Sequence, residues 1–485
     1  MSLLRRLTYV RTEATSTSLA NGASAALGLV RDLLIVVALG LSYDADAYFL
    51  SLQVVQTLYW LGFGGTTLVF LQADIARIAR VTSRFAPTML LAISGRRRLA
   101  VVAAAVSASA FVAVELRTNN SGTAAAVGVL AGLATLVRAR VEILDAVAAS
   151  YGAFAVPSLI AATQNLGVIV AAALTLTSDS GLSAIWVGVV LGFLTNWVVL
   201  HVWLVRQGRL APRSVRLTSP APSARGESAP LAAHIALTQV PQVADQAVMS
   251  ALVPGGAAAF ALARRIVGAL GTILIMPLRN MLLVNAARNA EVVGVPVLGF
   301  SAIALVLSQL IAVALYIGKG WVAETELELV ATLVLVLGPG VIASAAHAVM
   351  ARVSHASGVA TGPFRRALFA TTVHVCGILL AYKTSSLELL ALAYSLGWTL
   401  AIMREERSAR GLGWEGGREV PPFLAVATLS TLLLAGGRQL VASKLGLVDV
   451  TVILAMTLVA WSRLRQRSVA AAMTTPLMEP RDSRR

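Results

Sequence analysis

The sequence predicts an all-α polytopic membrane protein that crosses the bilayer about fourteen times. Of its 485 residues, 57% are hydrophobic and 13% are charged, and the mean hydropathy is +0.79. A soluble protein of this length carries about a quarter charged residues. The apolar residues also come in long unbroken runs, and within lipid only a helix satisfies its own backbone groups along such a run.

Runs of about 20 mostly apolar residues, the length that spans a bilayer, define the expected helices. The first six predicted spans are residues 23–41, 47–72, 99–116, 124–149, 154–177 and 182–205. The next six are 231–253, 257–279, 296–317, 328–350, 366–382 and 386–403, and two more follow at 422–440 and 446–462.

Basic residues predict the orientation of these spans. With a cytoplasmic N-terminus, the cytoplasmic segments hold 29 Lys and Arg and the opposite loops hold five. Cytoplasmic loops of membrane proteins carry just such an excess of basic residues. We therefore expect a multi-pass protein of the bacterial inner membrane with both termini in the cytoplasm.

The longest polar stretch between the two sets of six spans is residues 207–230, rich in Ser, Pro, Ala and Arg, which is typical of a flexible linker. It divides the chain into a first lobe at 1–206 and a second lobe at 231–403, followed by two extra spans and a basic tail at 404–485. A weak repeat supports two pseudo-symmetric six-helix lobes: Asp32 precedes Tyr48 by sixteen residues, and Asp245 precedes Phe260 by fifteen. Paired halves around a central site are common in secondary transporters.

Several classes of function are excluded by this pattern. The net charge of +16 does not indicate a nucleic-acid partner, because the basic residues lie in short gaps between apolar runs, where anionic lipid headgroups attract them. The sequence has no nucleotide-binding GxxxxGK[ST] motif, no set of residues at metal-ligand spacing, and a single cysteine, Cys376. We expect no cofactor, no metal and no enzymatic activity.

Ionisable residues within the first eight predicted spans are the candidate functional residues. A charge at the centre of a spanning helix costs about 2.5–3.5 kcal/mol on insertion scales, so such residues usually face a cavity or a partner. The ten residues are Arg31, Asp32, Asp46, Arg138, Arg140, Glu142, Asp145, Asp245, Arg264 and Arg265.

Arginines in both lobes suggest an anion site. Arg31 is either half of a structural ion pair or a cation that lines a central cavity, where its guanidinium would bind phosphate in a bidentate fork. Arg264 and Arg265 could supply a second donor from the other lobe. Adjacent helical residues point about 100° apart, so we expect only one of these two to face the cavity.

The acidic residues are open to two interpretations. Arg138, Glu142 and Asp145 share one helix face, either as an internally neutralised stripe or as a proton or cation relay. Asp245 follows Pro241, which allows a bend in the helix. Asp245 could therefore couple an ion to movement, or it could pair with Arg264 or Arg265; Asp32 is the other acid that could bind a coupling ion.

The stretch from Ala26 to Gln72 resembles the MurJ (MviN) lipid II flippase family of the multidrug/oligosaccharidyl-lipid/polysaccharide (MOP) exporter superfamily. The resemblance rests on ALGLVRDLLIVVALG, DADAYFLSLQVVQTLY and GFGGTTLVFLQ, and it extends to ILDAVAASYGAFAVPSLIAATQNLGVI and AFALARRIVGALGTILIMPL. It implies alternating access between the lobes, a cationic cavity for a pyrophosphate-sugar headgroup, and a groove for the polyprenyl tail on the last two spans.

The resemblance also implies roles for individual residues. Arg31, Asp46 and Arg265 stand where that family has its first-span arginine, second-span aspartate and eighth-span arginine. Ala25, Tyr59 and Gly64 depart from it, because the family usually has arginine, arginine and an acid there. Fewer cavity cations would weaken the capture of pyrophosphate, since each lost charged hydrogen bond costs about 1.5–3 kcal/mol.

The function expected from these observations is the transfer of a polyprenyl-pyrophosphate-linked cell-wall precursor, similar to lipid II, from the cytoplasmic to the outer leaflet. The expected partners are this lipid-linked substrate, membrane lipids and the envelope-synthesis machinery. Three alternatives stay open: a flippase for O-antigen or exopolysaccharide repeat units, a drug/cation antiporter, and an envelope-assembly scaffold that does not transport.

Overall fold

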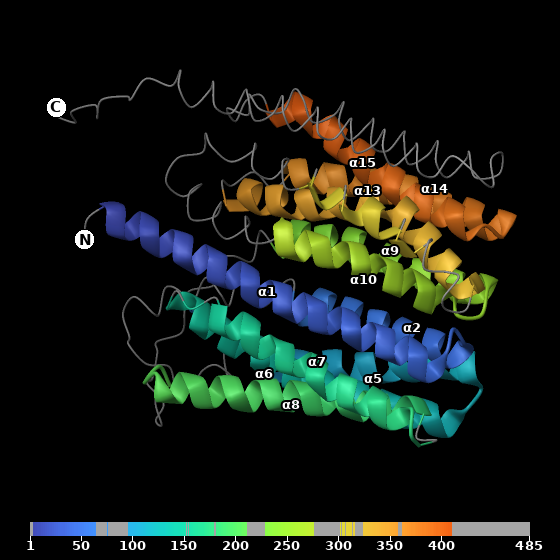
Figure 1. The fold of residues 1–485 in the computed structure, drawn as a ribbon, viewed down its shortest axis with the longest axis horizontal. Helices are drawn as coiled ribbons and strands as arrows, with labels where there is room; N and C mark the ends of the chain where they lie inside the picture. The colour runs from blue at the N-terminus through green and yellow to red at the C-terminus, as the bar shows by residue number, and fades with distance from the viewer. Residues whose placement is uncertain are drawn as a thin grey trace.

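The computed structural model describes residues 3–64, 75, 96–151, 153, 155–178, 181–210, 228–275, 324–356 and 361–409, together with most of 301–315. These residues form helices that run roughly side by side along the long axis of the molecule, and no strand occurs among them (Figure 1). The predicted all-α fold is thus confirmed. The predicted spans at 422–440 and 446–462 and most of the linker lie outside the described residues.

The first lobe contains the helices before the linker. They are α1 (Leu3–Leu39), α2 (Tyr43–Tyr59) with a π-helical turn η1 (Trp60–Gly64), α5 (Arg96–Thr118), α6 (Ser121–Ser150), α7 (Ala155–Thr175) and α8 (Gly181–Arg206). Polar side chains begin two of them: the Ser42 hydroxyl accepts the N–H of Ala45, and the Asn120 carbonyl accepts the N–H of Thr123. Both satisfy backbone donors that the first turn of a helix leaves unpaired.

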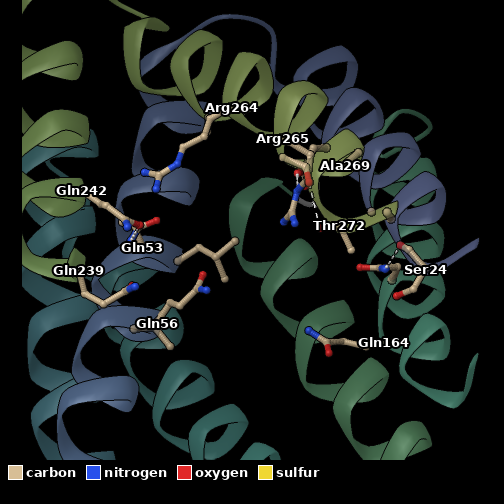
Figure 2. A pocket seen from close by; sticks show the side chains of 18 of the residues that line it. Ser24, Gln53, Gln56, Gln164, Gln239, Gln242, Arg264, Arg265, Ala269 and Thr272 are labelled. Carbon is tan, nitrogen blue, oxygen red and sulfur yellow. Dashed lines mark hydrogen bonds and ion pairs between the residues drawn. The ribbon is translucent and has the colours of Figure 1, made fainter. Parts of the chain in front are cut away.

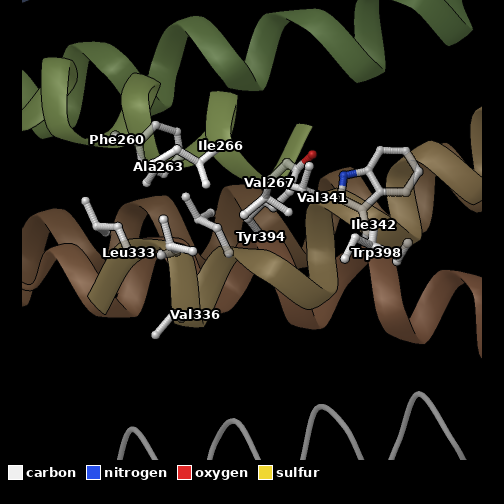
Figure 3. Close-up of a cluster of buried hydrophobic side chains, with 14 of the residues drawn as sticks. Phe260, Ala263, Ile266, Val267, Leu333, Val336, Val341, Ile342, Tyr394 and Trp398 are labelled. Atoms are coloured by element: carbon white, nitrogen blue, oxygen red, sulfur yellow. The ribbon is translucent and has the colours of Figure 1, made fainter. Parts of the chain in front are cut away.

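The second lobe contains the helices after the linker, namely α9 (Ser228–Leu252), α10 (Gly256–Leu274), α13 (Glu324–Ala356), α14 (Thr361–Thr384) and α15 (Leu387–Ala409). Its core lies where α10, α13 and α15 meet (Figure 3). Phe260, Ile266 and Val267 of α10 pack there against Leu333 of α13 and Trp398 of α15. One face of α10 is therefore committed to the lobe interior, which leaves its opposite face for the space between the lobes.

Eight helices in the described part of the chain are long and apolar enough to cross a membrane. They lie within α1, α5, α6, α7, α8, α10, α13 and α14. Large aliphatic side chains on them are exposed, among them Leu116, Val129 and Leu379, as expected of surfaces that face lipid. Helix α9 falls outside this set because three glutamines interrupt its apolar sequence.

The two lobes meet along α1 and α2. Helix α1 packs against α7 of its own lobe and against α10 of the second lobe, and it lies between the two sets of helices in Figure 1. Helix α2 packs against α5 in the first lobe and against α9 and α10 in the second. The main helix contacts between the lobes are therefore those of α1 and α2 with α9 and α10.

Glycines allow α7 and α8 to approach closely. A Cβ atom built on Gly167 would lie 2.7 Å from the carbonyl oxygen of Gly188, and one built on Gly192 would overlap the carbonyl oxygen of Gln164. Small residues at such positions are typical of helix contacts in membranes, because they bring the two backbones together. The packing of α7 on α8 thus depends on these positions having no side chain.

We predict that Gly192→Leu destabilises the first lobe, because overpacking costs about 1–3 kcal/mol. The variant should unfold at a lower temperature in detergent, and a smaller fraction of it should be monodisperse in size-exclusion chromatography. Gly268→Ala is the matched control, since no heavy atom lies within 4 Å of a Cβ built there. Equal midpoints for Gly192→Leu and the wild-type protein would contradict the close contact.

Candidate functional site

A cavity of about 810 Å³ lies between the lobes. Its walls come from α1, α2, α6, α7 and α8 of the first lobe and from α9, α10, α13 and α15 of the second (Figure 2). Polar side chains cover much of the wall, although the helices that carry them are mostly apolar. A polar cavity at the junction of two helical lobes is the arrangement expected of a transport site.

Asp32 joins the two lobes at the cavity wall. Arg31 of α1 donates from Nε to Asp32 Oδ1 at 2.7 Å, and Arg265 of α10 donates from Nε to Asp32 Oδ2 at 2.7 Å. Arg31 also donates from Nη1 to the Asn165 side-chain oxygen of α7 at 3.0 Å. The Asp32 side chain is only 3% exposed, so both of its oxygens are neutralised where water cannot solvate them.

Arg264 and Arg265 both line the cavity, so the expectation that only one of them would face it is wrong (Figure 2). The cavity-facing positions of α10 include Ala261, Gly268 and Thr272, which lie seven and four residues apart and therefore share one face of the helix. The stripe is wide enough to hold two adjacent arginines, one toward each edge. Arg265 pairs with Asp32, whereas Arg264 lies over the Tyr394 ring at 5.3 Å and forms no ion pair within the described residues.

The charges of α6 form a second group on the first-lobe wall. Arg138 donates from Nε to Glu142 at 2.9 Å and lies 4.3 Å above the Tyr59 ring, while the Tyr59 hydroxyl donates to Glu142 at 2.8 Å. Arg138 and Glu142 therefore neutralise each other. The buried Oδ1 of Asp145 has no hydrogen-bond partner in the described structure, and Arg140 lies 5.9 Å from the Trp197 ring.

Neutral amides line the cavity between these charges. Gln53 of α2 donates to the Gln242 side chain of α9 at 3.1 Å, across the lobe interface. Gln56, Gln164 and Gln239 point their amides toward the open space in Figure 2. Each amide offers a carbonyl acceptor and two N–H donors, which suits hydroxyl and amide groups on a bound molecule.

Asp46 lies away from the cavity and caps a helix of the other lobe. Its carboxylate accepts the N–H of Gly255 on Oδ2 and the N–H of Ala258 on Oδ1, each at 3.0 Å. These are the first N–H groups of α10, where the helix dipole favours a negative charge. Gly255 has a left-handed φ of 78°, and a Cβ atom there would lie 2.5 Å from that of Leu41, so the turn fits closely against the first lobe.

Arg117 binds the other side of the same turn. Its Nη1 and Nη2 atoms donate to the carbonyl oxygens of Ser250 and Ala247 at 3.4 and 3.1 Å, at the C-terminal end of α9. The α9–α10 turn is thus held by an acid at the N-terminus of one helix and by a base at the C-terminus of the other. We call Asp46, Arg117 and this turn the interlobe clamp.

Asp245 does not form the ion pair that was one of its two expected roles. It pairs with neither Arg264 nor Arg265 and does not line the cavity. Instead, Nε2 of His374 on α14 lies 2.7 Å from its Oδ1, with both side chains buried. The weak repeat that related Asp245 to Asp32 therefore does not extend to their partners.

The sequence marks the charged residues of the site but not the residues that they contact. Asn165, His374 and Arg117 had no signal of their own, because each becomes informative only when a distant helix packs beside it. The glutamines of α9 did carry a signal: they recur at 239, 242 and 246, every three or four residues, which marks one polar face of an otherwise apolar helix. No cluster of three or more metal-ligating side chains occurs among the described residues.

Several solved structures of membrane transporters share this fold. A lipid II flippase MurJ in an inward closed conformation is 15% identical, with 93% of this chain and 99% of that chain covered at a TM-score of 0.64. A mutant MATE transporter from Vibrio cholerae is 12% identical, with 83% and 98% covered at 0.55. A MOP superfamily transporter from Pyrococcus furiosus is 12% identical, with 89% and 97% covered at 0.53.

No protein-family model and no curated protein sequence matches the chain. At identities of 12–15% the structural likeness shows the fold alone. The fold that the sequence resemblance implied is therefore confirmed, and it is shared by a lipid II flippase, a MATE transporter and another MOP superfamily transporter.

We predict that Asp46→Ala loosens the interlobe clamp, because each lost hydrogen bond to a charged acceptor costs about 1.5–3 kcal/mol. Tyr43 and Val253 are exposed on the two sides of the clamp and can carry spin labels. Double electron–electron resonance should show a population with a longer distance between the two labels in this variant. Asp44→Ala removes an exposed acid from the same turn of α2 and serves as the control. Identical distance distributions for Asp46→Ala and wild type would show that the clamp does not hold the lobes.

Proposed function

We propose that this chain is a flippase that carries a polyprenyl-pyrophosphate-linked cell-envelope precursor from the cytoplasmic to the outer leaflet by alternating access. The observation that carries the proposal is the cavity between the lobes, with Arg264 and Arg265 on one of its walls and the interlobe clamp away from it. Both features belong to the α9–α10 hairpin, so movement of one hairpin would change both.

An anionic headgroup suits this cavity better than a cationic drug. Four arginines and three carboxyl groups line it within the described residues. Asp32 is neutralised by two arginines and Glu142 by Arg138, whereas Arg264 contacts an aromatic ring and forms no ion pair with any described residue. An arginine held only by a ring can turn to a phosphate, to which it donates in a bidentate fork.

The glutamine side chains that line the cavity favour a cargo with a sugar next to the phosphate. Gln56, Gln164 and Gln239 bear donors and acceptors without charge, which match the hydroxyl and acetamido groups of a glycan. The departures from the MurJ pattern fit the same view. Ala25 lines the cavity where that family usually has an arginine, and Tyr59 donates a hydrogen bond to Glu142, so the cavity holds fewer cations and relies more on neutral hydrogen bonds.

The basic-residue pattern gives the direction. With both termini in the cytoplasm, the loop after α1 and the α9–α10 turn face the outside, so the interlobe clamp closes the outer end. Cargo would then enter from the cytoplasmic leaflet while the clamp holds, and release of the clamp would open the cavity outward. The clamp contains polar contacts to helix ends, which can break and re-form without repacking a core.

The alternatives differ in what the cavity must bind. A flippase for O-antigen or exopolysaccharide units would use the same phosphate and sugar contacts, so only the cargo distinguishes it. A drug/cation antiporter would need a carboxylate without a basic partner, and Asp145 is the only such candidate among the described cavity residues. A scaffold in envelope assembly would bind no lipid-linked cargo. Peptidoglycan or other envelope enzymes are the partners that any of the lipid roles implies.

We predict that Arg264→Ala weakens binding of undecaprenyl pyrophosphate to the purified protein by about tenfold, which corresponds to the loss of one charged hydrogen bond. Native mass spectrometry or fluorescence titration would measure it, with lipid II as the second probe. Arg264→Lys should retain part of the affinity, because lysine keeps the charge without the fork.

The control is Lys383→Ala, which removes an exposed cation at the end of α14, outside the cavity. Equal affinity of the Arg264→Ala and wild-type proteins for both lipids would contradict the phosphate role. Binding of ethidium in place of either lipid, lost in Asp145→Asn, would favour the antiporter.

A further inference from the structure

Arg140 is a charged residue of a membrane-spanning helix that the cavity does not use. It belongs to α6, is exposed, and does not line the cavity between the lobes. Its guanidinium forms no ion pair or hydrogen bond with a described residue, and its central carbon lies 5.9 Å from the centroid of the Trp197 ring of α8. A charge on a spanning helix is costly unless a partner neutralises it, so Arg140 requires an anion from outside these helices.

The exposed neighbours of Arg140 show that it faces lipid. Val129 and Leu133 of α6 are 68% and 44% exposed, and they precede Arg140 by eleven and seven residues. These spacings correspond to about three and two helical turns, so the three residues share one face of α6. On α8, Val198 and Val202 are exposed in the same way. Figure 1 shows α8 on the side of the first lobe that is away from the second lobe.

Arg140 and Trp197 lie at the depth of lipid headgroups. Arg140 comes nineteen residues after the first residue of α6, or about 28 Å along the helix axis. Trp197 comes sixteen residues after the first residue of α8, or about 24 Å. The hydrocarbon core of a bilayer is about 30 Å thick, so both side chains approach its far boundary. With cytoplasmic termini, as expected from the basic residues, this boundary belongs to the inner leaflet.

His201 completes a polar surface at this depth. It follows Trp197 by one turn of α8, and the two ring centroids lie 6.0 Å apart. Tryptophan is enriched where a bilayer meets water, and an imidazole can both donate and accept hydrogen bonds. We call the surface formed by Arg140, Trp197 and His201 the α6–α8 seam.

The charges near the α6–α8 seam favour an anion. Helix α8 contains no acidic residue, and Arg206 at its end is exposed. Arg209 follows and lies 4.1 Å above the Tyr151 ring at the end of α6. The two carboxyl groups of α6, on Glu142 and Asp145, line the cavity instead. Basic surfaces between spanning helices on the cytoplasmic side are typical binding sites for anionic lipid headgroups.

We propose that the α6–α8 seam binds the headgroup of an anionic phospholipid of the surrounding bilayer. Arg140 donates to the phosphate in a bidentate fork while the Trp197 ring holds the other face of its guanidinium. His201 exchanges hydrogen bonds with a hydroxyl of the headgroup. The bound lipid bridges α6 and α8 and stabilises the first lobe by binding its folded state. This role does not depend on which cargo the cavity carries.

A resident phospholipid fits the α6–α8 seam better than the lipid-linked cargo. Both carry phosphate, but the seam is separate from the cavity and lies on the side of the lobe away from the second lobe. A zwitterionic phospholipid would bring an ammonium group close to Arg206, whereas the hydroxyls of phosphatidylglycerol carry no charge. Phosphatidylglycerol is therefore the probe.

The first test measures binding of phosphatidylglycerol to the delipidated full chain in detergent by native mass spectrometry. We expect Arg140→Ala to weaken this binding by about tenfold, the loss of one charged hydrogen bond, and Arg140→Lys to retain part of it. Arg97→Ala is the matched control, because it removes an exposed arginine from the start of α5. Equal affinity of Arg140→Ala and wild type would overturn the proposal, as would equal affinity of wild type for phosphatidylcholine.

The second test locates the lipid. Phosphatidylglycerol with brominated acyl chains quenches nearby tryptophans, and the share of quenching that Trp197→Phe removes is the signal of the α6–α8 seam. At one lipid per protein in detergent, Arg140→Ala should lose this share and Arg97→Ala should retain it. Quenching that Trp197→Phe leaves unchanged would place the lipid elsewhere and contradict the proposal.

Undecaprenyl pyrophosphate separates this site from the cavity. Arg140→Ala should bind it as tightly as wild type does, because Arg140 does not line the cavity. If Arg140→Ala loses undecaprenyl pyrophosphate but keeps phosphatidylglycerol, the α6–α8 seam binds cargo and the proposal is wrong. The Arg264→Ala variant tests the proposed function independently of either result.

Discussion

The arrangement of the cavity depends on the ion pairs of Asp32, whose carboxylate lies between Arg31 of the first lobe and Arg265 of the second. Arg31 and Asn165 hold it from the first lobe and Arg265 from the second. Breaking a buried ion pair by removing one partner costs about 3–5 kcal/mol, because the remaining charge is left without compensation. The Asp32–Arg265 ion pair therefore holds α1 and α10 together. If the lobes separate between these two helices, the Asp32 carboxylate needs a new partner in place of Arg265. An anionic cargo that binds Arg265 would compete directly with Asp32.

Around this pair, polar side chains repeatedly bind backbone groups at the ends and breaks of helices. Asp46 binds N–H groups that begin α10, and Arg117 binds carbonyls that end α9. The Thr371 hydroxyl of α14 donates to the Leu237 carbonyl of α9, which Pro241 leaves without its helical N–H partner. Unlike an apolar core, such contacts can be exchanged for water or cargo without repacking side chains. They all involve α9 or α10, whose hairpin touches the clamp, the cavity and the Asp245–His374 pair. This hairpin is accordingly the element that connects the interlobe clamp with the cavity.

The sequence predicted the helices well and the contacts between them poorly, for a physical reason. Helix positions follow from the length of apolar runs, which a bilayer constrains strongly, so the spans before the linker correspond to α1, α2 and α5–α8. Contacts across lobes depend on the rotation of each helix about its axis. The sequence could thus mark Asp245 as important, but not choose His374 over Arg264 as its partner. Asp46 was expected to bind substrate and is found on a helix terminus, because a cap from another helix leaves no pattern in either sequence segment.

The most direct test of the Asp32 ion pairs and of the proposed cargo is the exposure of lipid II at the outer leaflet. It is measured in bacterial cells that are depleted of their own flippase and express this chain. We expect the wild-type chain to restore exposure, and Arg31→Ala to fail while it is still inserted in the membrane, because Asp32 then loses the first-lobe half of its charge compensation. Full restoration by Arg31→Ala would contradict the central role of the Asp32 pair. No restoration by the wild-type chain, although it is present in the membrane, would contradict lipid II as the cargo.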